Sequence, residues 1–253
     1  MSFTTSLMKK SLLSLSIASI TALSASAFAE DANQTQRYQE PTRGFFLEHG
    51  TVAASGQASV ELHSGSDGLN SGGGIRLGLP NAELLLNSGL NDYDENSALL
   101  KWGLPRENTE GTKRTPVLWS LLAGVGHIDI DAENSANDVK QTNITLGIAA
   151  TVKADAGTFT ASPKLVYADN DVDDDTFFEL DLGAYVGIVE TEAGLFSAGI
   201  EALVTTADDT DTSIALGGRW LYNERINLDV VPFVFSDDDL IGVPGLVRLN
   251  IAF

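Results

Sequence analysis

Long runs in which apolar and polar residues alternate constrain this chain more than any other feature. Over residues 142–153, for example, Ile144 and Leu146 fall on one side of an extended chain, and Asn143 and Thr145 fall on the other. Successive side chains of a β-strand point to opposite faces of the sheet, so this pattern predicts strands with one apolar and one polar face. Runs of roughly 9–11 residues are also long enough for a tilted strand to cross a bilayer. The same alternation occurs over residues 51–63, 178–188 and 196–204.

About 12 such runs follow one another from residue 49 onward, separated by turn residues. No later segment approaches about 18 consecutive apolar residues, so a transmembrane helix is not expected. The sequence therefore predicts an all-β fold, a single closed up-and-down antiparallel transmembrane β-barrel of about 12 strands, with roughly 10–14 possible. The count stays open because Pro163 and Pro232 lie inside runs and residues 84–86 break the alternation. Alternation alone also fits a soluble barrel, whose apolar face would point inward.

The N-terminus has the marks of an export signal. Lys9 and Lys10 precede an apolar and small-residue run over residues 11–25, and Ala27 and Ala29 form an A-x-A site. A basic start, a short apolar core and such a site are typical of a cleaved secretory signal peptide. The expected division is a signal peptide over residues 1–29, a polar N-terminal lead-in over residues 30–48 and the barrel over residues 49–253.

The formal net charge of the chain is −20, which disfavours nucleic acid as a partner because such binding needs basic patches.

Acidic residues are concentrated in every second connection between the runs. In an up-and-down barrel every second connection lies at the same rim, and outer-membrane barrels carry their longer loops outside. The pattern therefore predicts an acidic extracellular mouth. The acidic connections contain Asp67, Asp92, Asp94, Glu95, Asp129, Asp131, Glu133, Asp138, Asp169, Asp171, Asp173, Asp174, Asp175, Asp208, Asp209, Asp211, Asp237, Asp238 and Asp239.

The C-terminal run alternates as well and ends on an aromatic residue. Val247, Leu249, Ile251 and Phe253 share one face of this run. With the signal peptide and the alternation of the whole chain, this ending resembles the outer-membrane β-barrel superfamily of Gram-negative bacteria. The resemblance implies a place in the cell outer membrane, contact with outer-membrane lipid and recognition of the last strand by the barrel-assembly machinery. It implies no subfamily, and we expect a monomer.

Charged residues on the polar faces are expected to line the lumen, because a charge on the lipid face costs about 2–4 kcal/mol near the midplane. A lumen of this kind favours a narrow, porin-like passive pore for small solutes, with mild cation preference from the acidic mouth. The alternatives are a non-conducting structural or surface barrel, a soluble periplasmic ligand-binding β-barrel and a membrane lipase. The expected lumen-lining residues are Glu61, His63, Arg76, Glu83, Lys101, Lys153, Lys164, Glu179, Asp181, Glu201, Arg219, Asp229 and Arg248.

The sequence gives little support for catalysis, cofactor binding or metal binding. The chain has no cysteine and only three histidines, and no run places a nucleophile, a base and an orienting group at a convincing spacing, so we expect no enzyme and no cofactor. Residues 169–180 alternate oxygen-bearing side chains but lack the Gly and Glu of an EF-hand. Weak divalent-cation binding at Asp169, Asp171 and Asp173 is the remaining metal hypothesis, against a solvated acidic loop.

Overall fold

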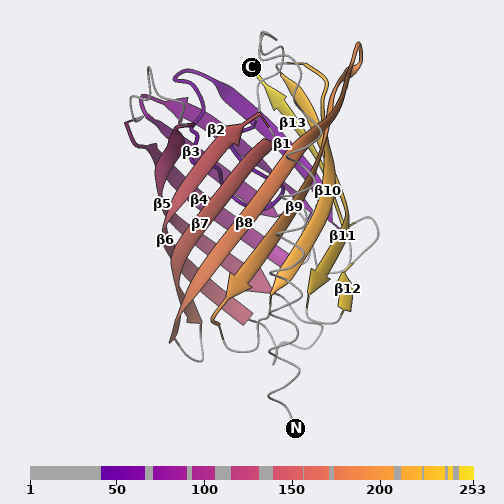
Figure 1. Ribbon diagram of the computed structural model, residues 1–253. Helices are drawn as coiled ribbons and strands as arrows, with labels where there is room; N and C mark the ends of the chain where they lie inside the picture. Colours follow the sequence, from indigo (N-terminus) through magenta and orange to yellow (C-terminus); the bar gives the residue numbers. More distant parts are fainter. Residues whose placement is uncertain are drawn as a thin grey trace.

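The structure is a computed structural model in which the strands form one barrel (Figure 1). It describes residues 41–65, 71–89, 93–105, 115–130, 139–155, 157–170, 174–207, 212–223, 225–236, 239–241 and 245–253. The expected signal peptide and most of the acidic connections lie outside these residues. Among the described residues, no helix is long and apolar enough to cross a membrane.

Twelve strands close a single antiparallel up-and-down barrel, which confirms the expected fold class. Consecutive strands pair with each other, and the last strand closes the barrel by pairing with both the first strand and β11. The short β12 pairs with β11 and stands outside this count. The strands are β1 (Ala58–Gly65), β2 (Gly72–Leu79), β3 (Ala82–Gly89), β4 (Tyr93–Gly103), β5 (Val117–Ile130), β6 (Val139–Ala154), β7 (Gly157–Asn170), β8 (Asp174–Thr191), β9 (Gly194–Thr205), β10 (Ser213–Leu221), β11 (Ile226–Ser236), β12 (Asp239–Ile241) and β13 (Leu246–Ala252).

The apolar faces of the strands point out of the barrel and the polar faces point in. Leu146 on β6 is 57% exposed, whereas Thr151 on the inward face of the same strand is fully buried. Leu62 on β1 is likewise exposed between the buried Glu61 and the half-buried His63. A soluble barrel would show the opposite arrangement, because its apolar side chains would fill the interior.

The features that disturbed the alternation have local explanations. Pro163 pairs with Leu180 on β8 but has no paired residue on β6, so its missing N–H falls at a gap in that ladder. Pro232 lies where β11 shifts register against β10 and where its pairing with β13 ends at Val231. Leu85 and Val231 are fully buried apolar residues that point inward, which is why residues around them do not alternate.

The two rims of the barrel differ in their connections. One rim, called the turn rim here, holds the start of β1, the end of β13 and short turns such as that between β2 and β3. Asn81 in that turn has a φ of 58°, a left-handed conformation that Asn tolerates. The opposite rim, called the acidic rim, holds the connections from β1 to β2, β3 to β4, β5 to β6, β7 to β8, β9 to β10 and β11 to β13. The Asp-rich segments therefore follow strands that all end at one rim.

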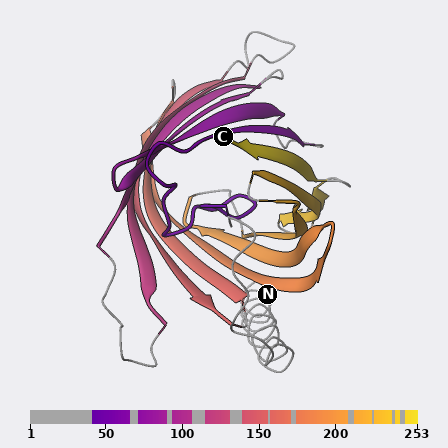
Figure 2. The same ribbon diagram turned by 90° about the horizontal axis from the view of Figure 1, so that it is seen from above.

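A segment preceding the first strand runs inside the barrel, seen as the indigo chain within the ring of strands in Figure 2. Its residues 42–49 fold back on themselves, with a β-bridge between Arg43 and Glu48. Gly44 N donates to Leu47 O at 2.8 Å, and His49 N donates to Thr42 O at 3.0 Å. We call residues 42–49 the lumen hairpin, with a tip at residues 44–47. The wall itself begins at Ala58, so residue 49, the expected start of the barrel, lies inside the lumen.

Candidate functional site

The tip of the lumen hairpin is held by one carboxylate of the wall. Glu201 on β9 accepts backbone N–H groups from Phe45, from Phe46 at 2.8 Å and from Leu47 at 3.2 Å. The hydroxyl of Tyr185 on β8 also donates to Glu201. Three amides that the turn leaves without backbone partners are thus satisfied by a single side chain that is 4% exposed.

Two arginines hold the carbonyl side of the same tip. Arg219 on β10 donates to the carbonyls of Arg43 at 3.1 Å and Gly44 at 3.0 Å, and its guanidinium also forms a two-point pair with Asp229 at 2.6 and 2.9 Å. Arg248 on β13 donates through Nη1 to the carbonyl of Phe45. The planar, many-donor guanidinium suits this bridging between backbone and carboxylate.

Aromatic packing surrounds the polar contacts at the tip. Phe45 is fully buried and meets Tyr185 edge-on, with ring centroids 5.6 Å apart. The guanidinium of Arg219 lies 5.6 Å from the centre of the Phe45 ring, within the range of a cation–π contact. The buried apolar cluster around Phe45 consists of Tyr185, Ala215, Val231, Val234 and Leu246. The inward-pointing apolar residue Val231 on β11 therefore packs in the cluster around the hairpin.

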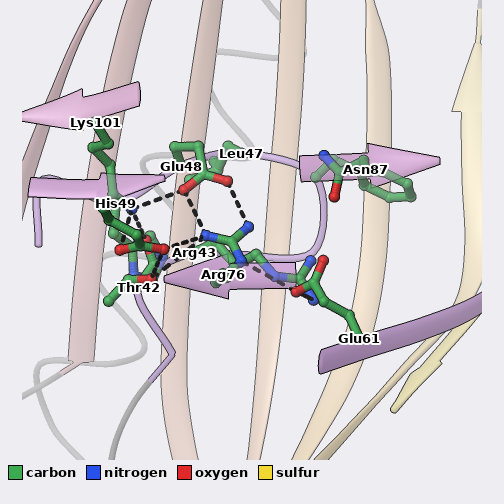
Figure 3. A network of polar contacts seen from close by, with 12 residues as sticks. Thr42, Arg43, Leu47, Glu48, His49, Glu61, Arg76, Asn87 and Lys101 are labelled. Carbon is green, nitrogen blue, oxygen red and sulfur yellow. Dashed lines mark hydrogen bonds and ion pairs between the residues drawn. The ribbon is translucent and has the colours of Figure 1, made fainter. Parts of the chain in front are cut away.

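The base of the hairpin joins an ion-pair network with strands β1 to β4 (Figure 3). Figure 3 shows Arg76 between Glu48 and Glu61. Nη2 of Arg76 lies 2.7 Å from Glu48, and its Nε lies 3.2 Å from Glu61. Lys101 contacts Glu48 at 2.8 Å and donates to the carbonyl of Thr42 at 2.8 Å. Charges on the hairpin and on the wall are therefore paired across the lumen.

The remaining contacts complete this network. Arg43 reaches Glu61 at 2.6 Å. Glu83 on β3 is fully buried and receives Arg76 at 2.8 Å and the amide of Ala53 at 2.8 Å. Buried charges of this kind are stable only when every partner is in place, so removing one partner is expected to be costly.

Two glycines let the hairpin approach the wall closely. A Cβ on Gly44 would lie 1.8 Å from the hydroxyl of Tyr185, and a Cβ on Gly50 would lie 2.0 Å from the carbonyl oxygen of Leu118. The obstacle at Gly50 is backbone, which cannot swing away as a flexible side chain can. Larger residues at these positions would hold the segment off the wall.

The surroundings of the hairpin shift the pKa values of Glu48 and His49. Burial raises the pKa of Glu48, but the ion pairs with Arg76 and Lys101 outweigh burial and hold it well below its usual range. Burial, helped by the positive charges of Arg219 and Lys101, holds the pKa of His49 well below its usual range. Neither ring nitrogen of His49 has a hydrogen-bond partner in the described structure. The docked hairpin thus carries an ionised Glu48 and an uncharged His49.

The hairpin divides the lumen into unequal spaces. On its acidic-rim side lie a cavity of about 370 Å³ lined by Arg248, Glu61 and His63, and one of about 270 Å³ lined by Lys164, Asp181 and Glu201. Phe46 at the tip lines both cavities. On the turn-rim side a space of only about 40 Å³ lies between the hairpin and the strand ends. The hairpin therefore forms a constriction in the lumen.

The predicted lumen residues fall into separate groups in the structure. The first group contacts the base of the hairpin. The second contacts its tip, with Asp229 acting through Arg219. Lys164 pairs with Glu179 at 2.5 Å and with Asp181 at 2.6 Å. His63 borders the larger cavity and Lys153 is half-buried on β6. The base group is Glu61, Arg76, Glu83 and Lys101; the tip group is Glu201, Arg219, Asp229 and Arg248.

The other predicted site residues are less informative. Val247, Leu249 and Ile251 lie on β13 and alternate with buried Arg248 and Asn250, while Phe253 is 71% exposed at the turn rim. Among the residues that the structure covers, no group of three or more acids and histidines could hold a metal ion. Asp169 is the last residue but one of β7, and residues 171 and 173 of the divalent-cation hypothesis lie outside the described part.

Sequence reasoning did not place the hairpin itself in the site. Residues 30–48 were expected to be a polar lead-in, yet Phe45 and Leu47 are buried in the lumen. The signal was present in the run of apolar residues 45–47 between Arg43 and Glu48. A scan against protein-family models gave no match, and no curated protein matched the sequence.

Proposed function

We propose that this protein is an outer-membrane β-barrel that provides a narrow passive path for small solutes, with the lumen hairpin as its closing element. The observation that carries the proposal is the reversal of polarity described above, with apolar side chains outside the barrel and paired charges inside. Apolar residues exposed to water over the whole outer wall would be a large aggregation-prone surface, whereas in a bilayer they meet lipid tails.

The expected orientation places the acidic rim outside the cell and the turn rim in the periplasm. Outer-membrane barrels have short periplasmic turns and longer external loops. All the turn-rim connections of this barrel except that from β4 to β5 are short, and the Asp-rich segments lie at the other rim. The acidic rim would concentrate cations at the entrance and give the path a mild cation preference. We further propose that β13, with Val247 and Phe253, is the strand that the barrel-assembly machinery recognises.

The passage itself follows from the division of the lumen. The two larger cavities are separated from the turn rim by the hairpin, which hydrogen bonds and ion pairs hold against the wall without a disulfide. Displacing the hairpin would join the cavities to the turn rim. Solutes would pass in that state, and the docked state would be closed or nearly closed.

Planar-bilayer recording of the purified full-length protein tests this proposal. We expect rare, brief openings from the unaltered protein and frequent openings from Gly50→Val, whose side chain cannot fit against the carbonyl of Leu118. Gly126→Ala is the matched control, because its Cβ would meet only Ser97 at an ordinary 3.7 Å. Folded protein that shows no conductance in any of the three forms would overturn the passive path.

The same recording decides the second candidate, a non-conducting structural barrel. The observation in its favour is the dense ion-pair network of Arg76, Glu48, Glu61, Glu83 and Lys101, which would brace a barrel whose lumen never opens. Cell fractionation tests the membrane location separately. Recovery of the protein in the periplasmic extract, rather than in the detergent-solubilised envelope, would favour a soluble ligand-binding barrel.

A further inference from the structure

Five of the described cations in the lumen have a carboxylate partner, and Arg248 has none. Arg43, Arg76, Lys101, Lys164 and Arg219 each form at least one ion pair with an acid. Arg248 is 8% exposed, and no carboxylate of the described residues lies within 4.0 Å of it. A buried cation without a counter-ion is expensive, because desolvation is not repaid by an opposite charge.

The donors of Arg248 are also only partly used. A guanidinium carries five N–H donors. The Nη1 group of Arg248 donates to the carbonyl of Phe45, and its buried Nε has no partner in the described structure. His63 pairs with Arg248 across β1 and β13, and its buried Nδ1 likewise lacks a partner. Two neighbouring polar groups on the wall are therefore unsatisfied at the same place.

Both groups border the cavity of about 370 Å³ on the acidic-rim side of the hairpin. This volume lies at the lower end of the range of about 300–1,000 Å³ that small-molecule sites occupy. The lining is mixed, since Phe46 and Leu246 add apolar surface to the polar groups. Phe46 is 46% exposed even though it belongs to the tip of a hairpin that is otherwise tightly bound. A ligand with a charged end and an apolar body would use both kinds of surface.

None of the three carboxylates of the lining forms an ion pair with Arg248. Glu48 is held by Arg76 and Lys101, and Glu61 is held by Arg43 and Arg76. The third carboxylate, Glu95, is on β4, which three intervening strands of the wall separate from β13. Arg248 is therefore the one cation of this lining that no described carboxylate contacts.

We infer that this cavity binds a small organic monocarboxylate, with its carboxylate on Arg248 and its apolar body against Phe46 and Leu246. The planar guanidinium fork matches a carboxylate, and a single unpaired positive charge matches a single negative charge better than a dianionic phosphate. This site goes beyond the proposed passage, because binding requires only the lumen and would persist in a barrel that conducts nothing.

The acidic rim affects how fast an anion enters the lumen, whereas Arg248 affects how tightly the anion is bound. Rim carboxylates repel an approaching anion, and salt screens that repulsion over about 8 Å at physiological ionic strength. We therefore expect the association rate of a carboxylate to rise with salt. The paired charges inside are buried and are screened much less.

Isothermal titration of the full-length protein in detergent micelles provides the test, with benzoate as the probe and benzamide as its uncharged counterpart. We expect benzoate to bind, benzamide to bind at least tenfold more weakly, and inorganic phosphate to bind at least tenfold more weakly than benzoate. Equal binding of benzoate and benzamide would overturn the inference, as would an absence of benzoate binding. Phosphate binding that matches or exceeds benzoate would overturn the assignment to a carboxylate. None of these comparisons needs a variant.

The variant Arg248→Gln tests whether Arg248 is the residue that binds the carboxylate. It keeps a donor for the carbonyl of Phe45, removes the charge, and should weaken benzoate binding at least tenfold. The matched control is Arg225→Gln, which removes the same charge from an exposed position at the turn rim and should bind benzoate as the unaltered protein does. Benzoate binding that survives unchanged in folded Arg248→Gln would place the anion elsewhere and sink the proposal.

Discussion

Replacing Glu201 by Ala should release the lumen hairpin without dismantling the barrel wall. The carboxylate accepts amides of Phe45, Phe46 and Leu47, of which the first and third belong to buried residues. A hydrogen bond to a charged group contributes about 1.5–3 kcal/mol, so these two alone give about 3 kcal/mol at the lower end. The lower end applies because the variant also removes the cost of burying the carboxylate itself.

This difference should be large in the docking equilibrium. At about 1.4 kcal/mol for each tenfold change, 3 kcal/mol raises the ratio of released to docked hairpin about 150-fold. Open probability in planar bilayers measures that ratio directly. Glu190→Ala is the matched control, because Glu190 is an exposed carboxylate of β8 near the turn rim.

The reasoning fails if folded Glu201→Ala opens no more than threefold more often than the unaltered protein or Glu190→Ala. Folding is checked by a heat-dependent shift on a denaturing gel, which reports an intact barrel independently of conductance. A normal gel shift with unchanged gating would mean that the hairpin is held by its base alone, or that it does not close the path.

Three further predictions concern pH, buried charge and the lipid face. The pKa of His49 is lowered when the hairpin is docked, so below about pH 6.5 the released hairpin binds a proton on His49 and the docked hairpin does not. The free energy of docking therefore weakens as pH falls, by up to about 1.4 kcal/mol per pH unit. Openings should therefore increase between pH 7 and 5, and His49→Phe, which stays uncharged, should remove most of that increase. Lys101→Met leaves Glu83 and Glu48 short of a buried cation and should lower the free energy of unfolding in urea by about 3–5 kcal/mol, and an effect below 1 kcal/mol would contradict the buried network. Leu146→Arg should destabilise the barrel in lipid vesicles by about 2–4 kcal/mol, whereas Leu104→Arg at the turn rim should cost about 1 kcal/mol or less, and equal effects would argue against a membrane-facing wall.

The wall of the barrel could be predicted from the sequence because its signal is local. Residues such as Ile144 and Leu146 fall on one face simply because a strand repeats every two residues, and no knowledge of distant partners is needed. The common rim of the acidic connections follows from the same regularity, since an up-and-down order sends every second connection to one side. The strand number stayed open where Pro163 and Pro232 lie inside runs and where an inward apolar residue, such as Leu85 or Val231, interrupts the alternation.

The lumen hairpin could not be predicted in the same way, because its partners are far away in the chain. Glu201 is 156 residues from Phe45, and Arg248 is 203 residues from it. The inward charges were expected to line a lumen, but nothing local indicates that Arg219 would bind backbone carbonyls of residues 43 and 44 rather than face water. The apolar run at residues 45–47 was the one clue, and it is short enough to occur in any loop.

The location of the hairpin at the start of the chain has a consequence for the order of folding. Its base binds β1 to β4, the first strands of the chain, while its tip binds β9, β10 and β13, which are among the last. The hairpin can therefore reach its final position only after the sheet has curled round and its first and last strands have met. Once docked, it ties the early half of the chain to the late half next to the seam between β1 and β13, and acts as a latch that fastens when assembly is complete.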